Sequence, residues 1–206
     1  EKIKIPYTGS GPSSSGLALD KVASKEVFIK NGISVPKYIA TNKRISIDDL
    51  DGNFKLPLVI KPQKEGSSIG LSVVREKDDF DGALQSAFNY GTTIIIEEFI
   101  NGMELTVGIL DDKPLPVIEI VPKEKVYDFG AKYLDAETEY IVPARIKEDK
   151  HKTAKDLGAK AHKALGCRDF SRVDMKMDEN GNIFVFEVNT IPGLTKRSLL
   201  PKAAQA

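Results

Sequence analysis

The sequence predicts an α+β fold with largely antiparallel sheets, arranged in two lobes that divide near residues 98–102. Two observations support this prediction. The apolar run "LPLVI" leads into a polar loop and then into a second apolar run, so two strands follow each other without a helix between them. Two later segments, "MELTVGILDDKPLPVIEIV" and "RVDMKMDENGNIFVFEVN", read as strand pairs around short turns. Strands joined by short turns pair in the antiparallel sense.

The first helix is expected over residues 18–31, where Gly32 ends it, and residues 33–41 read as an extended segment. Strands are expected at 56–62 and 70–75, on either side of the loop "KPQKEGSSIG". A P-loop runs from a strand into a helix with the pattern GxxxxGK[ST]. The strand–loop–strand order therefore argues against a P-loop NTPase.

Apolar residues at helical spacing predict a helix over 78–91, and the run "TTIIIEEFI" after it reads as a buried strand. Residues 123–142 lack a clean periodicity and read as a long ordered loop, of the kind that often carries function. An amphipathic helix is expected over 154–165, followed by the hairpin at 172–189.

Composition and charge exclude several classes of function. The 206 residues carry 30 basic and 30 acidic side chains, so no net field favours nucleic acid or an anionic membrane. No apolar run approaches the roughly 20 residues of a membrane-spanning helix, and no signal peptide opens the sequence. The single Cys167 is typical of a reducing compartment and is expected to be buried and inert. His151 and His162 fall on a Lys-rich helix, and we expect both on its solvent face. A soluble, cytoplasmic protein is predicted.

The loop "KPQKEGSSIG" leaves a buried-looking strand and spends ten residues on charge and backbone freedom, more than a surface turn needs. We interpret it as a loop that closes over an anion. Lys61 begins it, and Lys21 and Lys132 could converge on the same place, although a solvated side chain is the alternative for each. Because a lysine at a strand end contributes little to packing, Lys61→Ala is expected to weaken ligand binding more than the fold.

The hairpin at 172–189 has a readable register. Asn180-Gly181 is a strong signal for a two-residue type I′ turn, which would pair Glu179 with Asn182. Carried back along the strands, this register makes facing pairs of Asp174 with Glu187 and of Arg172 with Asn189.

Alternation along the two strands places those four side chains on one face of the hairpin. The side chains expected to point into the core are Val173, Met175, Phe186 and Val188. Two facing carboxylates destabilise a sheet unless a positive charge lies between them. Carboxylates with an amide are oxygen ligands that Mg²⁺ prefers. The hairpin therefore predicts a magnesium site, with a solvated sheet face as the alternative.

Five segments, in order along essentially the whole chain, resemble one family. They are "LPLVIKPQKEGSSIGLSVV", "IIIEEFINGMELTVGIL", "YDFGAKYL", "SRVDM" and "FEVNTIPGLTKRSLLPKAA". Together they are similar to the D-alanine–D-alanine ligase family, which has the ATP-grasp fold. The resemblance implies ATP-dependent, ADP-forming joining of two D-alanines through an acyl phosphate, for peptidoglycan precursor synthesis. It also implies ATP and two Mg²⁺ (or Mn²⁺) ions as cofactors, and a homodimer at full length.

The resemblance also implies which residues bind the nucleotide. Lys21 and Lys61 match the lysines that touch the phosphates, and Lys132 matches the lysine near the transferring phosphoryl group. The backbone that approaches the phosphates corresponds to Gly66, Ser67 and Ser68. The hinge that reads the adenine corresponds to Glu97, Glu98 and Ile100, and the acid that binds the ribose hydroxyls corresponds to Glu104.

The metal ligands of the family match Asp174, Glu187 and Asn189. Arg172 and the Gly193 N–H match the groups that stabilise the oxyanion of the tetrahedral intermediate. Ser198 matches the residue that binds the carboxylate of the acceptor D-alanine, and Ser67 and Tyr133 match two members of a hydrogen-bonded set around the first D-alanine. A tyrosine at 133 resembles the dipeptide-forming enzymes more than those that make D-alanyl-D-lactate.

Two departures qualify the resemblance. Family members carry an additional N-terminal domain that supplies a glutamate to the first D-alanine, so residues 1–17 are expected to be the remnant of a linker. The small lobe would then be 18–100 and the catalytic lobe 101–206, truncated at its end. The segment "TKRS" at 195–198 differs from the commoner family pattern beside the acceptor site. The alternatives are another ATP-grasp carboxylate–amine ligase and a non-catalytic nucleotide-binding module.

Overall fold

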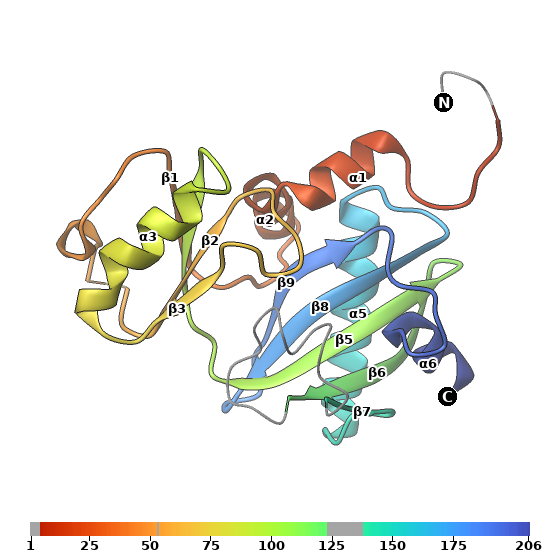
Figure 1. Cartoon of the computed structure of the whole chain (residues 1–206). Coiled ribbons are helices and arrows are strands. Elements are labelled where there is room, and N and C mark those ends of the chain that lie inside the picture. The colour runs from red at the N-terminus through yellow and green to blue at the C-terminus, as the bar shows by residue number, and fades with distance from the viewer. Residues whose placement is uncertain (1–4, 53, 123–137) are drawn as a thin grey trace.

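The computed structural model describes residues 5–52, 54–122 and 138–206, which form two antiparallel sheets with helices packed against them (Figure 1). The four-stranded sheet, in the order β1-β4-β2-β3, contains β1 (Tyr38–Thr41), β2 (Leu58–Pro62), β3 (Ser72–Val74) and β4 (Ile94–Glu98). The five-stranded sheet, in the order β7-β6-β5-β8-β9, contains β5 (Gly102–Leu110), β6 (Lys113–Val121), β7 (Glu139–Ile141), β8 (Phe170–Asp178) and β9 (Ile183–Asn189). The predicted α+β class is confirmed.

Five helices are present in the described residues, together with short 3₁₀ turns at Ile47–Asp49 and Lys77–Asp79. They are α1 (Pro12–Leu19), α2 (Lys21–Lys30), α3 (Phe80–Phe88), α5 (Glu148–Ala164) and α6 (Leu199–Gln205). The single helix expected over 18–31 is wrong. Asp20 has an extended backbone and its side chain accepts the Ala23 N–H at 3.1 Å, so it caps a new helix instead of continuing the first.

Each sheet has its own apolar core. In the four-stranded sheet, Ile94 and Ile96 of β4 pack with Phe80 and Leu84 of α3. The five-stranded sheet packs against α5, and Ala18, Phe28 and Ile33, from α1, α2 and the turn after it, join that second core. The predicted division into residues 18–100 and 101–206 remains a prediction about domains.

The two faces of β5 receive different partners. Gly158 of α5 lies against Val107, where a Cβ on the glycine would be 3.1 Å from the valine side chain. The next residue, Gly108, faces α6, and a Cβ there would come within 2.6 Å of Leu200. Because side chains alternate along a strand, α5 and α6 cover opposite faces of the sheet. The even-numbered side of β5 is thus the face away from α5.

The predicted facing pairs are present in the hairpin of β8 and β9, but the turn and the register next to it differ from the prediction. Arg172 pairs with Asn189 and Asp174 with Glu187, but the register shifts beyond Asp174 so that Met175 pairs with Val185. Asp178 N–H donates to the Asn182 carbonyl at 2.9 Å, which closes a three-residue loop with Gly181 at a φ of 80°. The predicted two-residue turn is therefore wrong.

A bulge at Phe186 compensates for the extra loop residue. The buried side chains of β9 are Ile183, Val185 and Val188. Between Val185 and Val188 lie two consecutive residues, Phe186 and Glu187, which therefore share the other face of the strand with Phe184. The expectation that Phe186 points into the core is wrong, and Val185 takes that place. Val173, Met175 and Val188 lie in the core as predicted.

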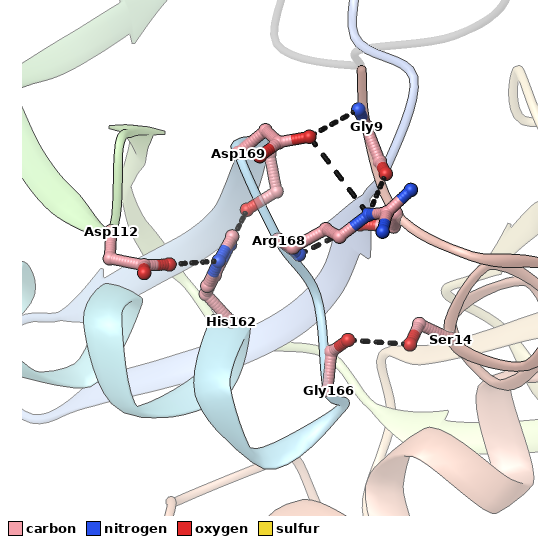
Figure 2. Close-up of polar contacts among 9 residues, drawn as sticks. Gly9, Ser14, Asp112, His162, Gly166, Arg168 and Asp169 are labelled. Carbon is pink, nitrogen blue, oxygen red and sulfur yellow. Dashed lines mark hydrogen bonds and ion pairs between the residues drawn. The ribbon is translucent and has the colours of Figure 1, made fainter. Parts of the chain in front are cut away.

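The two histidines of α5 are not the solvent-face residues that the lysine content of the helix suggested. His162 is only 2% exposed, with Nδ1 at 2.7 Å from Ser171 Oγ and Nε2 at 3.1 Å from Asp112 Oδ1 (Figure 2). His151 is half-buried and its Nε2 lies 3.0 Å from the Ala144 carbonyl oxygen. His162 falls on the same helix face as Ala154 and Ala161, which is the face that enters the core.

The burial of His162 gives the fold a dependence on pH. Burial lowers the pKa of His162 below its ordinary 6.5, although Asp112 opposes this shift. The unfolded chain then binds the proton more tightly, so His162 stabilises the fold above about pH 6.5 and this stabilisation is lost as the pH falls below that value. We expect the wild-type protein to lose more unfolding free energy than His162→Gln between about pH 8 and pH 5. Denaturant titrations measure this, with His151→Gln as the control, and an equal loss in His162→Gln would contradict the account.

The segment before α1 lies against the start of β8 (Figure 2). Gly9 N–H donates to Asp169 Oδ2 at 2.6 Å, and Arg168 Nε donates to the Gly9 carbonyl at 2.6 Å. Ser14 Oγ donates to the Gly166 carbonyl at 2.6 Å. These contacts join the beginning of the chain to the turn after α5.

Cys167 in that turn is buried, as predicted, and burial raises the pKa of its thiol. Within the described residues, no helix is both long and apolar enough to cross a bilayer.

Candidate functional site

A cavity of about 460 Å³ lies between the two sheets. Its walls are the loop after β2, the connection from β4 to β5, the end of β6 and the outward face of the β8–β9 hairpin. Of the residues predicted for the site, nine line it: Lys21, Lys61, Gly66, Ser67, Ser68, Ile100, Glu104, Asp174 and Glu187. Glu97, Glu98, Arg172, Asn189, Gly193 and Ser198 do not line it, and Lys132 and Tyr133 lie outside the described residues.

The loop between β2 and β3 has the strand–loop–strand arrangement that the sequence predicted. Ser67 and Ser68 have φ values of 51° and 58°, and the Ile69 N–H donates to the Gly66 carbonyl at 3.0 Å. Two consecutive non-glycine residues in the left-handed region cost free energy, and such strain concentrates at ligand-binding segments. At Gly70, with a φ of 69°, a Cβ would come within 2.9 Å of the Pro62 and Tyr90 side chains, so glycine is required there.

Lys21, the first residue of α2, joins that helix to this loop. Its Nζ donates to the Glu65 carbonyl, and its own N–H donates to the Gln63 carbonyl at 3.1 Å. Burial lowers the pKa of Lys21, and the Coulombic attraction of Glu187 opposes that shift. Lys21 therefore lies between the loop and the acidic hairpin, where it can bind an anion that enters the cavity.

A buried charge cluster lies beside Lys21. The Glu97 carboxylate is fully buried, with Oε2 at 2.9 Å from Lys61 Nζ and Oε1 at 3.0 Å from Lys25 Nζ. Burial alone would raise the pKa of Glu97, but Lys61 and Lys25 lower it below its usual value, so the carboxylate stays ionised. The prediction that Glu97 reads a base edge remains a prediction, since both of its oxygens face lysines.

Sequence reasoning missed Lys25 and misjudged Lys61. Lys25 follows Lys21 by four residues on α2, which places both on one helix face and was the available signal. Lys61 is 7% exposed and part of the buried cluster. The expectation that it contributes little to packing is therefore wrong, because its aliphatic stem and its ion pair both lie inside the protein.

The connection from β4 to β5 provides an aromatic surface flanked by cations. Lys176 Nζ lies 5.0 Å from the centroid of the Phe99 ring, and the Arg75 guanidinium carbon lies 5.8 Å from it. Lys176 Nζ also donates to the Ile100 carbonyl at 3.5 Å, and it faces Glu104 across β5 and β8. Glu98 turns away from the cavity, and its Oε1 accepts the Lys37 N–H at 2.8 Å. Lys176 is a cavity residue that the sequence analysis did not single out.

The acidic face of the hairpin is held by three donors. Arg172 makes a two-point contact with Asp174, Nε to Oδ1 at 2.8 Å and Nη2 to Oδ2 at 2.6 Å. Thr106 Oγ1 donates to Asp174 Oδ1 at 2.7 Å. The Asn189 amide lies between the two acids, with Nδ2 at 2.9 Å from Asp174 Oδ2 and 3.5 Å from Glu187 Oε1. Thr106 is a further residue that the sequence analysis missed.

This arrangement fits a divalent cation chemically. Two carboxylates and one amide share a small region, and rotation of the Asn189 amide exchanges its NH₂ for an oxygen ligand. Among residues 5–52, 54–122 and 138–206, no three His, Cys, Asp or Glu side chains gather as a metal cluster. A set of two acids and an amide leaves room for oxygens from a bound ligand, as Mg²⁺ sites commonly do.

Gly193 and Ser198 come together at the start of α6. A Cβ on Gly193 would lie 2.6 Å from Ser198 Oγ, so a glycine is needed for the two segments to approach. Ser198 Oγ accepts the Thr195 N–H at 3.1 Å and lies 2.9 Å from Thr195 Oγ1. These contacts close the loop that follows β9, and the roles predicted for Gly193 and Ser198 remain predictions.

Comparison with known proteins places this geometry in a family. The family model described as "D-ala D-ala ligase C-terminus" matches residues 27–206. The D-alanine–D-alanine ligase of Trichlorobacter lovleyi is 44% identical over 207 residues, which cover all of this chain and 66% of that protein. The crystal structure of the Bacillus anthracis D-alanine–D-alanine ligase superimposes with a TM-score of 0.87 at 37% identity, covering 99% of this chain and 67% of the other.

A second structure of the Bacillus anthracis ligase, complexed with ATP, matches with a TM-score of 0.84 at 33% identity, over 99% of this chain and 65% of the other. The chain thus spans about two thirds of the length of the relatives that it matches. The fold is that of the ATP-grasp ligases, as the sequence predicted. This chain belongs to the D-alanine–D-alanine ligase C-terminus family.

Proposed function

We propose that the chain is the ATP-binding and catalytic portion of a D-alanine–D-alanine ligase, which joins two D-alanines with conversion of ATP to ADP. The observation that carries this proposal is the cavity between the sheets, where two lysines and a strained loop face a pair of opposed carboxylates. A triphosphate with a divalent cation is a ligand that complements both walls. The ATP complex of the Bacillus anthracis ligase supports the same assignment.

Each wall has a role in the proposal. Lys21 and Lys61 bind phosphate oxygens, and the backbone of Gly66, Ser67 and Ser68 approaches them. Asp174, Glu187 and Asn189 would hold Mg²⁺, which lowers the charge repulsion between the phosphates and an attacking carboxylate. Arg172 keeps Asp174 oriented.

The remaining parts of the proposal rest on the family. Ile100 and Glu98 would contribute backbone to the adenine site, Glu104 would bind the ribose hydroxyls, and Ser198 with the Gly193 N–H would act on the amino-acid substrates. Lys132 and Tyr133 would act near the transferred phosphoryl group and the first D-alanine. We also propose the two-lobe division at residue 100, a homodimer at full length, a cytoplasmic location and a place in peptidoglycan synthesis.

The proposal is tested by measuring ADP formation by the full-length ligase with a panel of amino acids. We expect ADP formation that depends on D-alanine and is accompanied by formation of D-alanyl-D-alanine. The chain of 206 residues alone is expected to bind Mg-ATP but to ligate slowly or not at all, because about one third of the length of the matched relatives has no counterpart in it. Activity with other amino acids and none with D-alanine would contradict the proposal in favour of another carboxylate–amine ligase.

A further inference from the structure

We propose that Lys25 is a positioning residue for the nucleotide site: it neutralises Glu97 from inside the protein and so leaves the positive charge of Lys61 available to the phosphates. The inference rests on the proposed function and extends it to a residue that does not touch the ligand. Its basis is the buried cluster in which two lysines share the two oxygens of one carboxylate, at 3.0 Å and 2.9 Å.

The cluster has an inner and an outer lysine. Lys61, from β2, lines the cavity, whereas Lys25, from α2, does not and is fully buried. Lys25 Nζ lies 5.4 Å from the centroid of the Tyr38 ring and 5.8 Å from that of Phe186. Lys25 is therefore enclosed by Glu97 and aromatic rings, so it does not contact a ligand in the cavity and acts on one only through its charge and through its hold on Glu97.

The net charge of the cluster affects how tightly the cavity binds an anion. With both lysines charged and Glu97 ionised, the cluster carries a net charge of +1. Without Lys25 the remaining pair would be neutral, and the ammonium of Lys61 would be held by Glu97 alone. Because the local dielectric constant of a buried site is low, such a change in charge is poorly screened.

Phe186 contributes to this arrangement from the other side. Its ring centroid lies 5.7 Å from Lys61 Nζ as well as 5.8 Å from Lys25 Nζ, so one ring covers both lysines. The bulge in β9 places Phe186 on this face together with Glu187. The acidic hairpin and the lysine cluster are therefore adjacent, which places a positive and a negative wall around one ligand.

The experiment compares the binding of ATP, inorganic tripolyphosphate and adenosine to four proteins. These are the wild type, Lys25→Met, Glu97→Gln and the double variant Lys25→Met with Glu97→Gln, whose cluster charges are +1, 0, +2 and +1. We expect Lys25→Met to weaken ATP and tripolyphosphate binding about tenfold and to leave adenosine binding within about twofold. The double variant should recover most of the lost affinity for tripolyphosphate, and Glu97→Gln should bind it at least as tightly as the wild type. Lys30→Met, at an exposed lysine of the same helix, is the control and should change nothing.

A purely structural role of Lys25 predicts a different pattern. Parallel weakening of adenosine and tripolyphosphate in Lys25→Met, or a double variant weaker than Lys25→Met, would overturn the inference. If Lys25→Met does not fold, the comparison of Glu97→Gln with the double variant decides, since the inference requires the former to bind tripolyphosphate more tightly. Tripolyphosphate binding that follows the charges, together with no adenosine or ATP binding, would overturn the proposed function but leave the effect of Lys25 on phosphate binding intact.

Discussion

We expect the replacement of Glu187 by glutamine to lower the Mg-ATP-dependent turnover of the proposed ligase by about two orders of magnitude or more, because a charged oxygen ligand in the proposed metal site becomes a neutral one. The structure gives this change a narrow target. Glu187 faces Asp174 across the hairpin and lines the cavity. Burial lowers the pKa of Lys21, and Glu187 is close enough to Lys21 to oppose that shift. Glutamine keeps the size of the side chain, so the fold should be retained. Initial rates of ADP formation over a range of Mg²⁺ concentrations measure the effect.

Glu179→Gln is the matched control, because it makes the same chemical change on the same hairpin at an exposed position. Its Oε1 accepts the Asn101 Nδ2 group at 2.7 Å, a contact that glutamine can also make. We expect this variant to retain wild-type turnover. Near-normal rates in Glu187→Gln would mean that the metal is held elsewhere.

We expect the replacement of Glu97 by alanine to destabilise the protein by about 3–5 kcal/mol, since two buried lysines would lose their shared counter-ion. Lys25 and Lys61 would remain inside the protein, at 0% and 7% exposure, with no carboxylate between them. The unfolded chain can hydrate both lysines at no such cost. Denaturant unfolding of the chain, followed by circular dichroism, gives the difference in unfolding free energy.

The neighbouring Glu98→Ala change separates this effect from the loss of any glutamate in β4. The Glu98 side chain is only half-buried, and its main contact is the Lys37 N–H at 2.8 Å. About 1 kcal/mol is expected for the loss of such a hydrogen bond. A loss below about 1 kcal/mol in Glu97→Ala as well would show that the lysines are uncharged or find water, contrary to the buried ion cluster.

The hairpin indicates how far the sequence can predict a site. The pairing of Asp174 with Glu187 was predicted from an Asn-Gly turn that the protein does not form. A three-residue loop adds one residue, the bulge at Phe186 adds another on the opposing strand, and the two deviations cancel beyond the bulge. Side-chain alternation is thus a strong signal near the site, whereas turn type and bulges depend on packing that a single strand does not encode.

Other residues escaped prediction because their environment is tertiary. Lys25 is one of 30 basic residues, and only its distance from Glu97, 72 positions later in the chain, distinguishes it. His162 looked exposed because its helix is rich in lysine, yet Ser171 and Asp112 come from other elements to enclose it. The motifs around Lys61, Glu104 and Asp174 were recognisable because each combines an apolar strand with polar residues that packing does not explain. The roles of Lys132 and Tyr133 remain predictions.

Binding of ATP to the chain of 206 residues, titrated calorimetrically with and without Mg²⁺, tests the central claim most directly: that opposed lysine and carboxylate walls form one site for a metal–nucleotide complex. The account predicts saturable binding with one nucleotide per chain, tightened by Mg²⁺ in the wild type and no longer tightened by Mg²⁺ in Glu187→Gln. Absence of nucleotide binding, or an affinity that responds neither to Mg²⁺ nor to the substitution, would contradict it.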